Sequence, residues 1–462
     1  MRMERKLRRF QDSETDNKVR TRAGATMTIT LSSFTQKARD NPKAQHTSLM
    51  GMVFNVDGLL DSFDRLPAKR AVGVDGMQKD VYAEGKEERI ADLSARLRRM
   101  GYRPKPSLRV YIPKANGGVR PLGIPSFEDK IVQDRLSQIL QAIWEPEFRT
   151  CSYGYRPNRG AHDALRRVAE SITNEDTQWV VEADIKGFFT NVVHEHLMKF
   201  LEHRISDPCF LRTIRRFLIA GVMEEGQFGA SDEGTPQGGL ISPVLANIYL
   251  HYVLDWWFEG AYAQTCRGRA SMVRYADDFV CCFQDEADAK RFMSTLTERL
   301  AEFGLEVEPS KTKLIRFGSH AQRDCEKDGR RRPATFSFLG LTHYVGTSRT
   351  GRFVVGRKTE GKRMIKKLKE LGLKLQHLRQ EGGKAMVTYV RQHLQGHFNY
   401  YGVSGNSRSI HAYGYHVAAR LFKWLNRRSQ RPSVTWERFD QLLRGGLLPK
   451  PRIIHDLYPK PL

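Results

Sequence analysis

A short polar break separates two apolar runs near the middle of the chain, and two adjacent carboxylates occupy it. Met272-Val273 precede the break and residues 279–283 follow it. Apolar runs of this length on either side of a tight polar turn predict two strands joined as a hairpin, with Asp277 and Asp278 at its tip. Adjacent acids repel each other unless cations bind them, so the pair indicates a magnesium site for phosphoryl chemistry. An Asp-Asp pair at a turn is also common in proteins without such a site.

A third acid is expected near this pair because it ends another strand-like run. Residues 179–185 read WVVEADI, and Asp184 comes at the end of the run. Two magnesium ions about 4 Å apart, which hold the attacking and leaving oxygens of a phosphoryl transfer, need acidic ligands from separate backbone segments. Asp184, Asp277 and Asp278 therefore predict a catalytic acidic cluster.

A glycine-rich loop followed by a helix lies between these acids in the sequence. Residues 234–243 read GTPQGGLISP, in which Ser242 is a suitable N-cap and Pro243 a suitable first helical residue. The helix is expected to bury Leu245, Ile248, Tyr249 and Tyr252. A later helix that ends at Gly304 is expected to cover the sheet behind the acids with Phe292, Leu296, Leu300 and Phe303.

Further motifs extend along most of the chain in a fixed order. They are residues 107–114 with 119–125 (SLRVYIPK and VRPLGIP), 152–157 (SYGYRP), the Asp184 run, 236–238 (PQG), 275–278 (YADD), 304–313, 338–340 (FLG) and 397–402 (HFNYYG). Each motif alone is weak, but the ordered set resembles the reverse transcriptases encoded by bacterial group II introns. No Cys/His cluster typical of a nuclease module follows them, which indicates the form that lacks an endonuclease domain.

The resemblance implies an α+β right-hand polymerase fold, with fingers, a palm that carries an antiparallel sheet, and a helical thumb. The segments expected on this basis are a basic N-terminal extension in 1–70, fingers in 71–150, a palm with the catalytic carboxylates in 151–345, a thumb or maturase domain in 355–422, and a basic C-terminal region with DNA contact in 423–462. Met27 is an alternative to Met1 as the first residue.

The resemblance also implies roles for single residues. A metal site for two Mg²⁺ ions, with Mn²⁺ as a substitute, would be formed by Asp184, Ile185, Asp277 and Asp278. Deoxynucleotide binding would involve Lys114, Arg120, Phe189, Gln237 and Lys311, with Phe189 excluding a 2′ hydroxyl. The hairpin that positions the primer end would be formed by Phe338, Leu339 and Gly340.

Some of these roles compete with plainer interpretations. Lys114 and Arg120 flank a segment of hairpin-turn composition, so a solvated hairpin tip is an equal alternative to triphosphate binding. Phe188 and Phe189 follow a strand and would ordinarily be core, although strand alternation would let one of them face the nucleotide. The chain has Thr190 where the family commonly has an aspartate, which bears on efficiency more than on the reaction type.

Composition agrees with a polyanionic partner. Lysine and arginine total 76 against 52 aspartates and glutamates, a formal net charge of +24, as expected of a nucleic-acid-binding protein. The 6 cysteines show no paired metal-binding spacing, and Cys281-Cys282 are expected to pack as small apolar residues. No apolar run approaches the roughly 18 residues of a membrane span, so a soluble, cytoplasmic protein associated with the nucleoid or with a ribonucleoprotein is expected.

Lysines and apolar residues alternate at helical spacing in 362–378. The apolar face is expected to hold Ile365, Leu368, Leu371, Leu375 and Leu378. A solvated charged surface is the default interpretation, but the net charge and the aromatic run 397–401 favour nucleic-acid contact, with cations on phosphates and aromatics stacking on bases. The cations expected to bind nucleic acid are Lys362, Lys366, Lys369, Arg427 and Arg428.

The sequence therefore predicts an RNA-directed DNA polymerase that copies RNA, in the resembling family its host intron RNA, from a DNA primer with deoxynucleotides. One alternative is a maturase that stabilises folded intron RNA for splicing, with polymerisation secondary. The other is a domesticated reverse transcriptase without an intron. A homodimer is left open.

Overall fold

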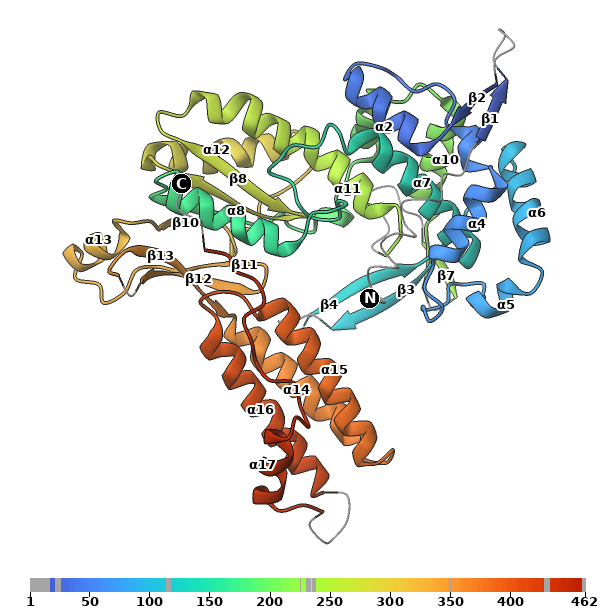
Figure 1. Ribbon diagram of the computed structural model, residues 1–462. Coiled ribbons are helices and arrows are strands. Elements are labelled where there is room, and N and C mark those ends of the chain that lie inside the picture. The colour runs from blue at the N-terminus through green and yellow to red at the C-terminus, as the bar shows by residue number, and fades with distance from the viewer. Residues whose placement is uncertain are drawn as a thin grey trace. The chain divides into compact units, whose positions relative to one another are not determined.

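The computed structural model describes residues 17–20, 26–113, 118–224, 226–229, 234, 238–348, 350–427 and 433–458. Figure 1 shows the helices and strands of the chain, coloured along the sequence. The chain forms two compact units, each assembled from three segments. The first unit contains Met1–Asn158, Ile185–Ala261 and Thr295–Val307. The second contains Arg159–Asp184, Tyr262–Ser294 and Glu308–Leu462. Helices and mostly antiparallel strands occur in both units, which confirms the α+β class.

The first unit surrounds α7 with shorter helices, the two-stranded sheet β1-β2 and one four-stranded sheet. Its elements up to α7 are β1 (Asn17–Arg20), β2 (Thr26–Ile29), α2 (Leu31–Asp40), α3 (Met50–Val53), α4 (Val56–Arg65), α5 (Lys79–Ala83), α6 (Lys86–Arg98), β3 (Ser107–Pro113), β4 (Val119–Ile124) and α7 (Phe127–Trp144). After these come a 3₁₀ helix (Phe188–Thr190), α9 (His194–Glu202), α10 (Pro208–Leu218), β6 (Val222–Glu224), β7 (Gln227–Gly229), α11 (Ser242–Leu250) and a π-helical turn (His251–Asp255). The four-stranded sheet has the order β4-β3-β6-β7, and β3 and β4 form an antiparallel hairpin.

The second unit holds two sheets and a group of long helices. Its first elements are α8 (Ala161–Asn174), β5 (Trp179–Ala183), β8 (Ala270–Tyr275), β9 (Asp278–Phe283), β10 (Lys313–Arg316) and α13 (Ala321–Lys327). They are followed by β11 (Phe336–Phe338), β12 (Leu341–Thr347), β13 (Phe353–Thr359), α14 (Gly361–Leu378), α15 (Gly383–Tyr401), α16 (Ser407–Leu425) and α17 (Trp436–Arg444). Helix α12 (Glu286–Ala301) begins in this unit and ends in the first one.

The four-stranded sheet of the second unit has the antiparallel order β10-β5-β9-β8. Strand β9 is buried from Phe279 to Phe283, so both of its faces are covered. Helix α8 packs on β8 and β9, and Phe292 of α12 contacts Phe283 with ring centroids 5.3 Å apart. Cys281 and Cys282 are buried in this strand as small apolar residues, as predicted.

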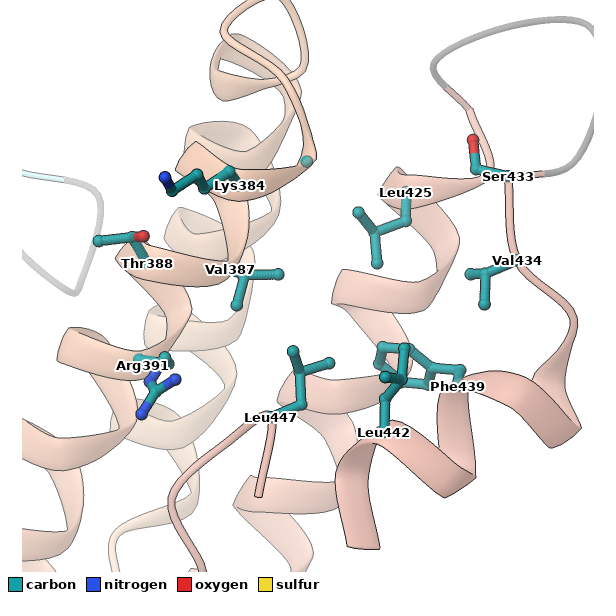
Figure 2. Close-up of a pocket in the computed structure, with 11 residues that line it drawn as sticks. Lys384, Val387, Thr388, Arg391, Leu425, Ser433, Val434, Phe439, Leu442 and Leu447 are labelled. Carbon is teal, nitrogen blue, oxygen red and sulfur yellow. The ribbon is translucent and has the colours of Figure 1, made fainter. Parts of the chain in front are cut away.

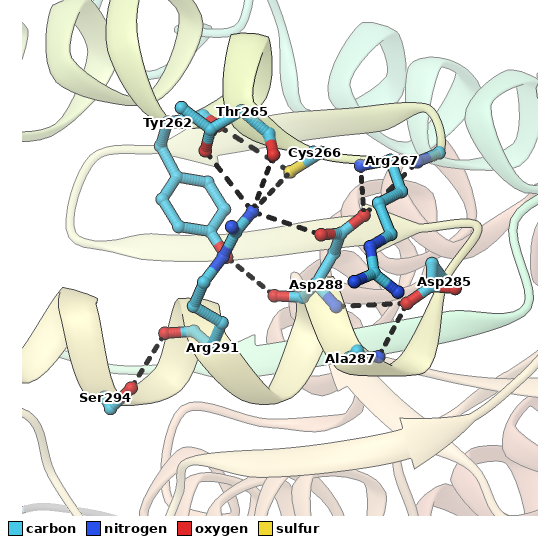
Figure 3. A network of polar contacts seen from close by, with 10 residues as sticks. Tyr262, Thr265, Cys266, Arg267, Asp285, Ala287, Asp288, Arg291 and Ser294 are labelled. Atoms are coloured by element: carbon cyan, nitrogen blue, oxygen red, sulfur yellow. Dashed lines mark hydrogen bonds and ion pairs between the residues drawn. The ribbon is translucent and has the colours of Figure 1, made fainter.

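The loop that leads into β8 is fixed by one carboxylate at the start of α12. The Oδ2 atom of Asp288 accepts hydrogen bonds from the backbone N–H groups of Arg267, at 2.7 Å, and Gly268, at 3.2 Å (Figure 3). Its Oδ1 atom accepts from Arg291, at 3.1 Å. Since β8 begins at Ala270, this buried acid sets the position from which the hairpin with the adjacent acids starts.

Two expectations about local structure were wrong. Ser242 is the first helical residue of α11, the cap is Ile241, and no side chain caps this end. The hydroxyl of Ser242 therefore has no capping role. The buried apolar residues of this helix follow the prediction except Tyr252, which is half-buried in the π-helical turn.

Helix α14 buries four leucines of its predicted apolar face, namely Leu368, Leu371, Leu375 and Leu378. The fifth member of that set was wrong, because Ile365 is 68% exposed. The aromatic run on α15 also differs from expectation. His397, Phe398 and Tyr401 are buried, and His397 stacks on Tyr413 of α16 with ring centroids 3.7 Å apart. These rings form the interior of the helical group and are not available to stack on bases.

All six cysteines are free thiols. Within the described ranges, no helix is both long and apolar enough to cross a membrane.

Leu375 and Ile365 offer a matched test of the α14 packing. We expect Leu375→Ala to lower the free energy of unfolding by about 2–5 kcal/mol, because it opens a cavity in the buried face. Ile365→Ala, on an exposed side chain of the same helix, should change it by less than about 0.5 kcal/mol. Urea unfolding followed by circular dichroism measures both, and equal losses in the two variants would contradict this packing.

Candidate active site

The two adjacent acids lie where the hairpin prediction placed them. Strands β8 and β9 pair in the register Tyr275 with Asp278, so Ala276 and Asp277 form a two-residue turn. Ala276 has a φ of +60°, a left-handed backbone conformation that is uncommon for a residue with a side chain. Strained residues of this kind are frequent at functional sites.

A buried arginine supports this turn from beneath. Arg274 in β8 is fully buried, and its guanidinium donates a hydrogen bond to the Ala276 carbonyl at 2.9 Å. Burial of a cation is costly unless its donors are satisfied, so the arrangement ties the turn to the interior of the sheet. Sequence reasoning missed Arg274, whose only local signal is a charge inside an otherwise apolar strand.

Strand pairing brings the third acid beside the other two. In the register of β5 with β9, Ala183 pairs with Phe279, so one step further Asp184 stands opposite Asp278. Residues directly opposite each other in antiparallel strands have Cβ atoms about 5 Å apart. The predicted convergence of Asp184, Asp277 and Asp278 is therefore a consequence of one hairpin and one strand register.

The electrostatics of the three acids show that they interact. The pKa of Asp278 is raised from 3.8 to about 6, first by desolvation and then by the negative charges of Asp277 and Asp184. The cations of Arg363 and Lys311 oppose this rise. Asp278 keeps solvent access at the turn, so the desolvation comes from the protein atoms that surround it rather than from complete enclosure.

Lys311 is held at the acids by the neighbouring strand. The Asp184 carbonyl accepts a hydrogen bond from the Glu308 N–H at 2.8 Å, and the turn that begins at Glu308 leads to Lys311 just before β10. The Lys311 ammonium forms an ion pair with the Asp184 carboxylate, which raises the pKa of the lysine. Lys311 was predicted to contact phosphates, and here its partner is a carboxylate.

The donor chemistry fits a hard divalent cation, while the side chains as they stand do not enclose one. Among the described residues, no group of three or more His, Cys, Asp or Glu side chains could hold a metal ion. Carboxylate oxygens are nevertheless the ligands that magnesium prefers, and such sites are usually completed by water and substrate phosphates. Desolvation and, after it, the charges of Asp277 and Asp184 raise the pKa of Asp278, and a bound cation would relieve this repulsion.

A second hairpin lies close to the acids. Phe338 pairs with Leu341, so Leu339 and Gly340 form a tight turn between β11 and β12, both with positive φ, of +50° and +77°. A Cβ on Gly340 would lie 2.9 Å from the Tyr401 hydroxyl, which leaves room only for glycine. The predicted hairpin at Phe338, Leu339 and Gly340 is thus present.

Strands and helices of the second unit hold this hairpin in place. The Ser337 N–H donates to the Glu182 carboxylate in β5 at 3.3 Å, and the Tyr400 hydroxyl donates to the Leu339 carbonyl at 3.0 Å. Burial, first of all, raises the pKa of Tyr400 to about 12, and the charge of Asp278 contributes to the rise, as expected of a tyrosine near the acids. The sequence analysis placed Tyr400 in the aromatic run 397–401 without this contact, and it did not identify Arg363, whose charge acts on Asp278.

Other predicted site residues belong to the first unit. Arg120 is exposed on β4, and Lys114 and Gln237 lie outside the described residues. Phe188 and Phe189 are both buried in a 3₁₀ helix, so the argument from strand alternation was wrong. The hydroxyl of Thr190 donates to the Gly187 carbonyl at 2.7 Å, which gives this residue a role in the turn.

Two further parts of the predicted site can be placed. Gly238 of the glycine-rich loop has a φ of +116°, and a Cβ there would lie 2.4 Å from the Gly123 carbonyl of β4, so the loop passes tightly over that strand. Ile185 follows Asp184 with its side chain buried, so only its backbone carbonyl could act as a ligand.

The predicted nucleic-acid contacts lie at the surface of the helical group. Lys362 and Lys369 are exposed on α14, whereas Lys366 is half-buried and pairs with Glu370 at 3.7 Å. Arg427 is exposed after α16, and Arg428 lies outside the described residues.

Comparison with known proteins gives consistent matches. The family described as "Reverse transcriptase (RNA-dependent DNA polymerase)" matches residues 112–343. The protein YkfC of Escherichia coli K12 is 40% identical over 238 residues, which cover 45% of this chain and 62% of that protein. The group II intron-encoded protein LtrA of Lactococcus lactis is 36% identical over 227 residues, 49% of this chain and 37% of LtrA.

A longer match covers more of the chain at lower identity. An uncharacterized 91 kDa protein in the cob intron of Schizosaccharomyces pombe is 28% identical over 434 residues, 79% of this chain and 52% of that protein. The chain thus spans from about a third to under two thirds of the length of these relatives.

The raised pKa of Asp278 predicts a pH-dependent stability. Between pH 3.8 and about 6 the folded chain binds more protons at this site than the unfolded chain, so the ionisation of Asp278 destabilises the fold progressively as the pH rises. Asp278→Asn removes this effect. We expect the free energy of unfolding of Asp278→Asn to equal that of the native chain near pH 3.8 and to exceed it by about 1 kcal/mol above pH 6. This value already allows for solvent screening at an exposed acid. Urea unfolding with a chelator present measures the difference, and a gain that does not vary with pH would refute it.

The hydrogen bond from Tyr400 offers a second test. Tyr400→Phe keeps the ring and removes the donor to Leu339, so the turn should open more often at a cost of about 1 kcal/mol. Hydrogen exchange of the amides in β11 and β12, followed by mass spectrometry, should be faster in this variant. Tyr415→Phe, on a 64% exposed side chain of α16, is the matched control and should exchange like the native chain.

Proposed function

The chain belongs to the reverse transcriptase (RNA-dependent DNA polymerase) family, and on that premise we propose that it extends a DNA primer by copying an RNA template. The observation that carries the proposal is the convergence of three carboxylates at the ends of β5, β8 and β9, with Lys311 as a basic partner. The matched residues 112–343 include all of these groups. The relatives found in introns support intron RNA as the template.

The proposed architecture is a right hand. The helical group α14–α16 is the thumb, the sheet β10-β5-β9-β8 is the centre of the palm, and the hairpin β3–β4 belongs to the fingers. The division into segments 1–70, 71–150, 151–345, 355–422 and 423–462 stays part of this proposal. Phe338, Leu339 and Gly340 would hold the primer end, because their turn is tied by Tyr400 to the thumb and lies near the acids.

The acids would hold two magnesium ions, with Asp184 and Asp277 as shared ligands, Asp278 completing the cluster and the Ile185 carbonyl as a backbone ligand. When bound, the ions would favour the attack of the primer 3′ hydroxyl on the α-phosphate of a deoxynucleotide and stabilise the leaving pyrophosphate. Asp278 is mostly ionised at neutral pH, since its pKa is about 6, and is then able to act as a ligand.

The Lys311 ammonium can change its ion-pair partner from a carboxylate to a phosphate. In the absence of substrate its ammonium neutralises Asp184, and its side chain is 63% exposed. A lysine on a flexible stem can transfer its hydrogen bonds to an arriving phosphate while a cation takes its place at the carboxylate. Arg120, Lys114, Gln237 and Phe189 are proposed to hold the triphosphate and the sugar, following the family resemblance.

A role in splicing is a second candidate, favoured by the exposed lysines of α14 and by the intron-encoded relatives. A maturase would bind folded intron RNA through surface cations and would not need the metal ligands. The two roles are compatible and can be separated by a single substitution in the acidic cluster.

The decisive variant is Asp277→Ala, and Asp328→Ala at an exposed acid of the same unit is its control. We expect Asp277→Ala to lower DNA-primed extension on an RNA template by at least about a thousandfold, because a ligand shared by both ions is lost. RNA binding should stay near native, since the surface cations are unchanged. Magnesium should also raise the melting temperature of the native chain more than that of the variant.

Extension by Asp277→Ala at the native rate would refute the assignment of the site. If the native chain binds intron RNA and promotes splicing but does not extend a primer, the polymerase proposal fails and the maturase role takes its place.

A further inference from the structure

A pocket lies at the end of the helical group that is remote from the acids. It has a volume of about 490 Å³ and opens between the first half of α15, the end of α16 and α17 (Figure 2). Its apolar lining consists of Val387, Leu425, Val434, Phe439, Leu442 and Leu447. Along α15, Val387 precedes Tyr400 by 13 residues, about 20 Å at the helical rise.

One side of this pocket is cationic. Lys384, Thr388 and Arg391 follow each other at helical spacing along α15, and all three are exposed at the rim (Figure 2). Within the described part of the chain, neither Lys384 nor Arg391 forms an ion pair. On α17, which forms the opposite wall, Asp440 is engaged with Arg444 at 2.7 Å, and neither Asp440 nor Glu437 lines the pocket. The rim therefore carries two uncompensated positive charges about 10 Å apart along the helix.

The floor of the pocket is built on a fixed aromatic ring, and its accessible surface is aliphatic. Phe439 is fully buried, and its ring contacts Phe422 and Trp436 with centroids 5.4 and 5.8 Å away, so it is fixed in place. Leu442 is 39% exposed at the edge of the pocket. A volume of this size lies within the range of small-ligand sites.

We propose that this pocket binds one unpaired base of a single-stranded nucleic acid, with the adjacent phosphates on Lys384 and Arg391. The charge selects the occupant, because an apolar protein segment would leave both cations without a partner, whereas a nucleotide strand presents a flat base and an anion together. Proteins that bind single strands without sequence preference combine a cationic groove for the phosphates with an apolar surface for the base faces, and here that surface is aliphatic. The inference rests on the proposed function, since it assigns an additional contact to the same nucleic acid.

The position of the pocket on α15 indicates a function for this contact with the nucleic acid. The opposite end of α15 holds the β11–β12 turn near the acids through Tyr400. A strand anchored at the pocket would therefore be held by the same rigid helix that positions the proposed primer end, at a distance that leaves the acids clear.

The test compares two leucines in the full-length chain. Leu442→Asn removes apolar surface from the pocket edge without a change of charge, and Leu373→Asn does the same at a 53% exposed position of α14 that does not line the pocket. Binding is measured by fluorescence with single-stranded DNA and, separately, single-stranded RNA oligonucleotides that carry 2-aminopurine. We expect Leu442→Asn to weaken binding about tenfold with an unchanged salt dependence, and Leu373→Asn to bind like the native chain.

A charge variant examines the cations at the rim. Lys384→Ala combined with Arg391→Ala should reduce the slope of log affinity against log salt by about 1.4, because two phosphates of the single strand would each be left without a cation. If only this slope changes and Leu442→Asn binds like the native chain, the site is a phosphate groove without a base pocket and the proposal is overturned. Native affinity in every variant would also overturn it and leave the pocket to an apolar protein segment. The oligonucleotide, RNA or DNA, whose binding is weakened more by these substitutions identifies the nucleic acid that the pocket binds.

RNA-templated extension by the same proteins separates this inference from the proposed function. Native extension by Leu442→Asn together with weakened oligonucleotide binding supports the pocket as an accessory contact. No extension by the native chain would refute the polymerase proposal. The proposal of a base pocket would still be decided by the binding of Leu442→Asn compared with that of Leu373→Asn.

Discussion

Repulsion among three carboxylates, imposed by strand register, is the constraint around which the second unit is organised. Asp184 stands opposite Asp278 because β5 and β9 pair in one register, and Asp277 occupies the turn that joins β8 to β9. The register cannot slip to separate them, since β9 is buried from its second residue onward and a shift of one residue would drive Asp278 into the interior. The hydrophobic core of the sheet thus supplies the energy that holds like charges together.

Cations from two different places offset this repulsion. Lys311 comes from the connection to β10 and Arg363 from the start of α14, while Arg274 holds the turn through the Ala276 carbonyl. The Arg363 side chain also packs against Gly340, and the Glu360 N–H donates to the Gly340 carbonyl at 3.1 Å. The hairpin at Gly340 and the helical group are consequently connected by direct contacts, and the charge of Arg363 acts on Asp278, so a movement of α14 would change the electrostatics of the carboxylates.

The sequence predicted those parts of the site that depend on local pattern. The β8–β9 hairpin and the strand before Asp184 follow from apolar runs that end in acids, and the buried leucines of α14 follow from helical spacing. The roles of Arg274 and Arg363 could not be predicted in the same way, because their partners are brought close only by the tertiary structure. Phe189 was misjudged because a single glycine, Gly187 with a φ of +56°, turns the chain into a 3₁₀ helix where alternation of a strand was assumed. The aromatic run of α15 was misjudged for a different reason, since Leu394, His397, Phe398 and Tyr401 recur at the spacing of one helical face, and that face is buried.

Contact with a polyanion must therefore depend on cations that the protein itself does not neutralise. Many of the basic residues are already engaged at helical spacing, as Lys199 is with Glu195 and Lys290 with Glu286, both at 2.7 Å. Within the described chain, Lys362 and Lys369 on α14, like Lys384 and Arg391 on α15, form no such pairs. The formal net charge of +24 counts paired and unpaired cations alike. Paired cations attract a polyanion less strongly, so the unpaired cations on α14 and α15 would displace counterions and contribute most to binding.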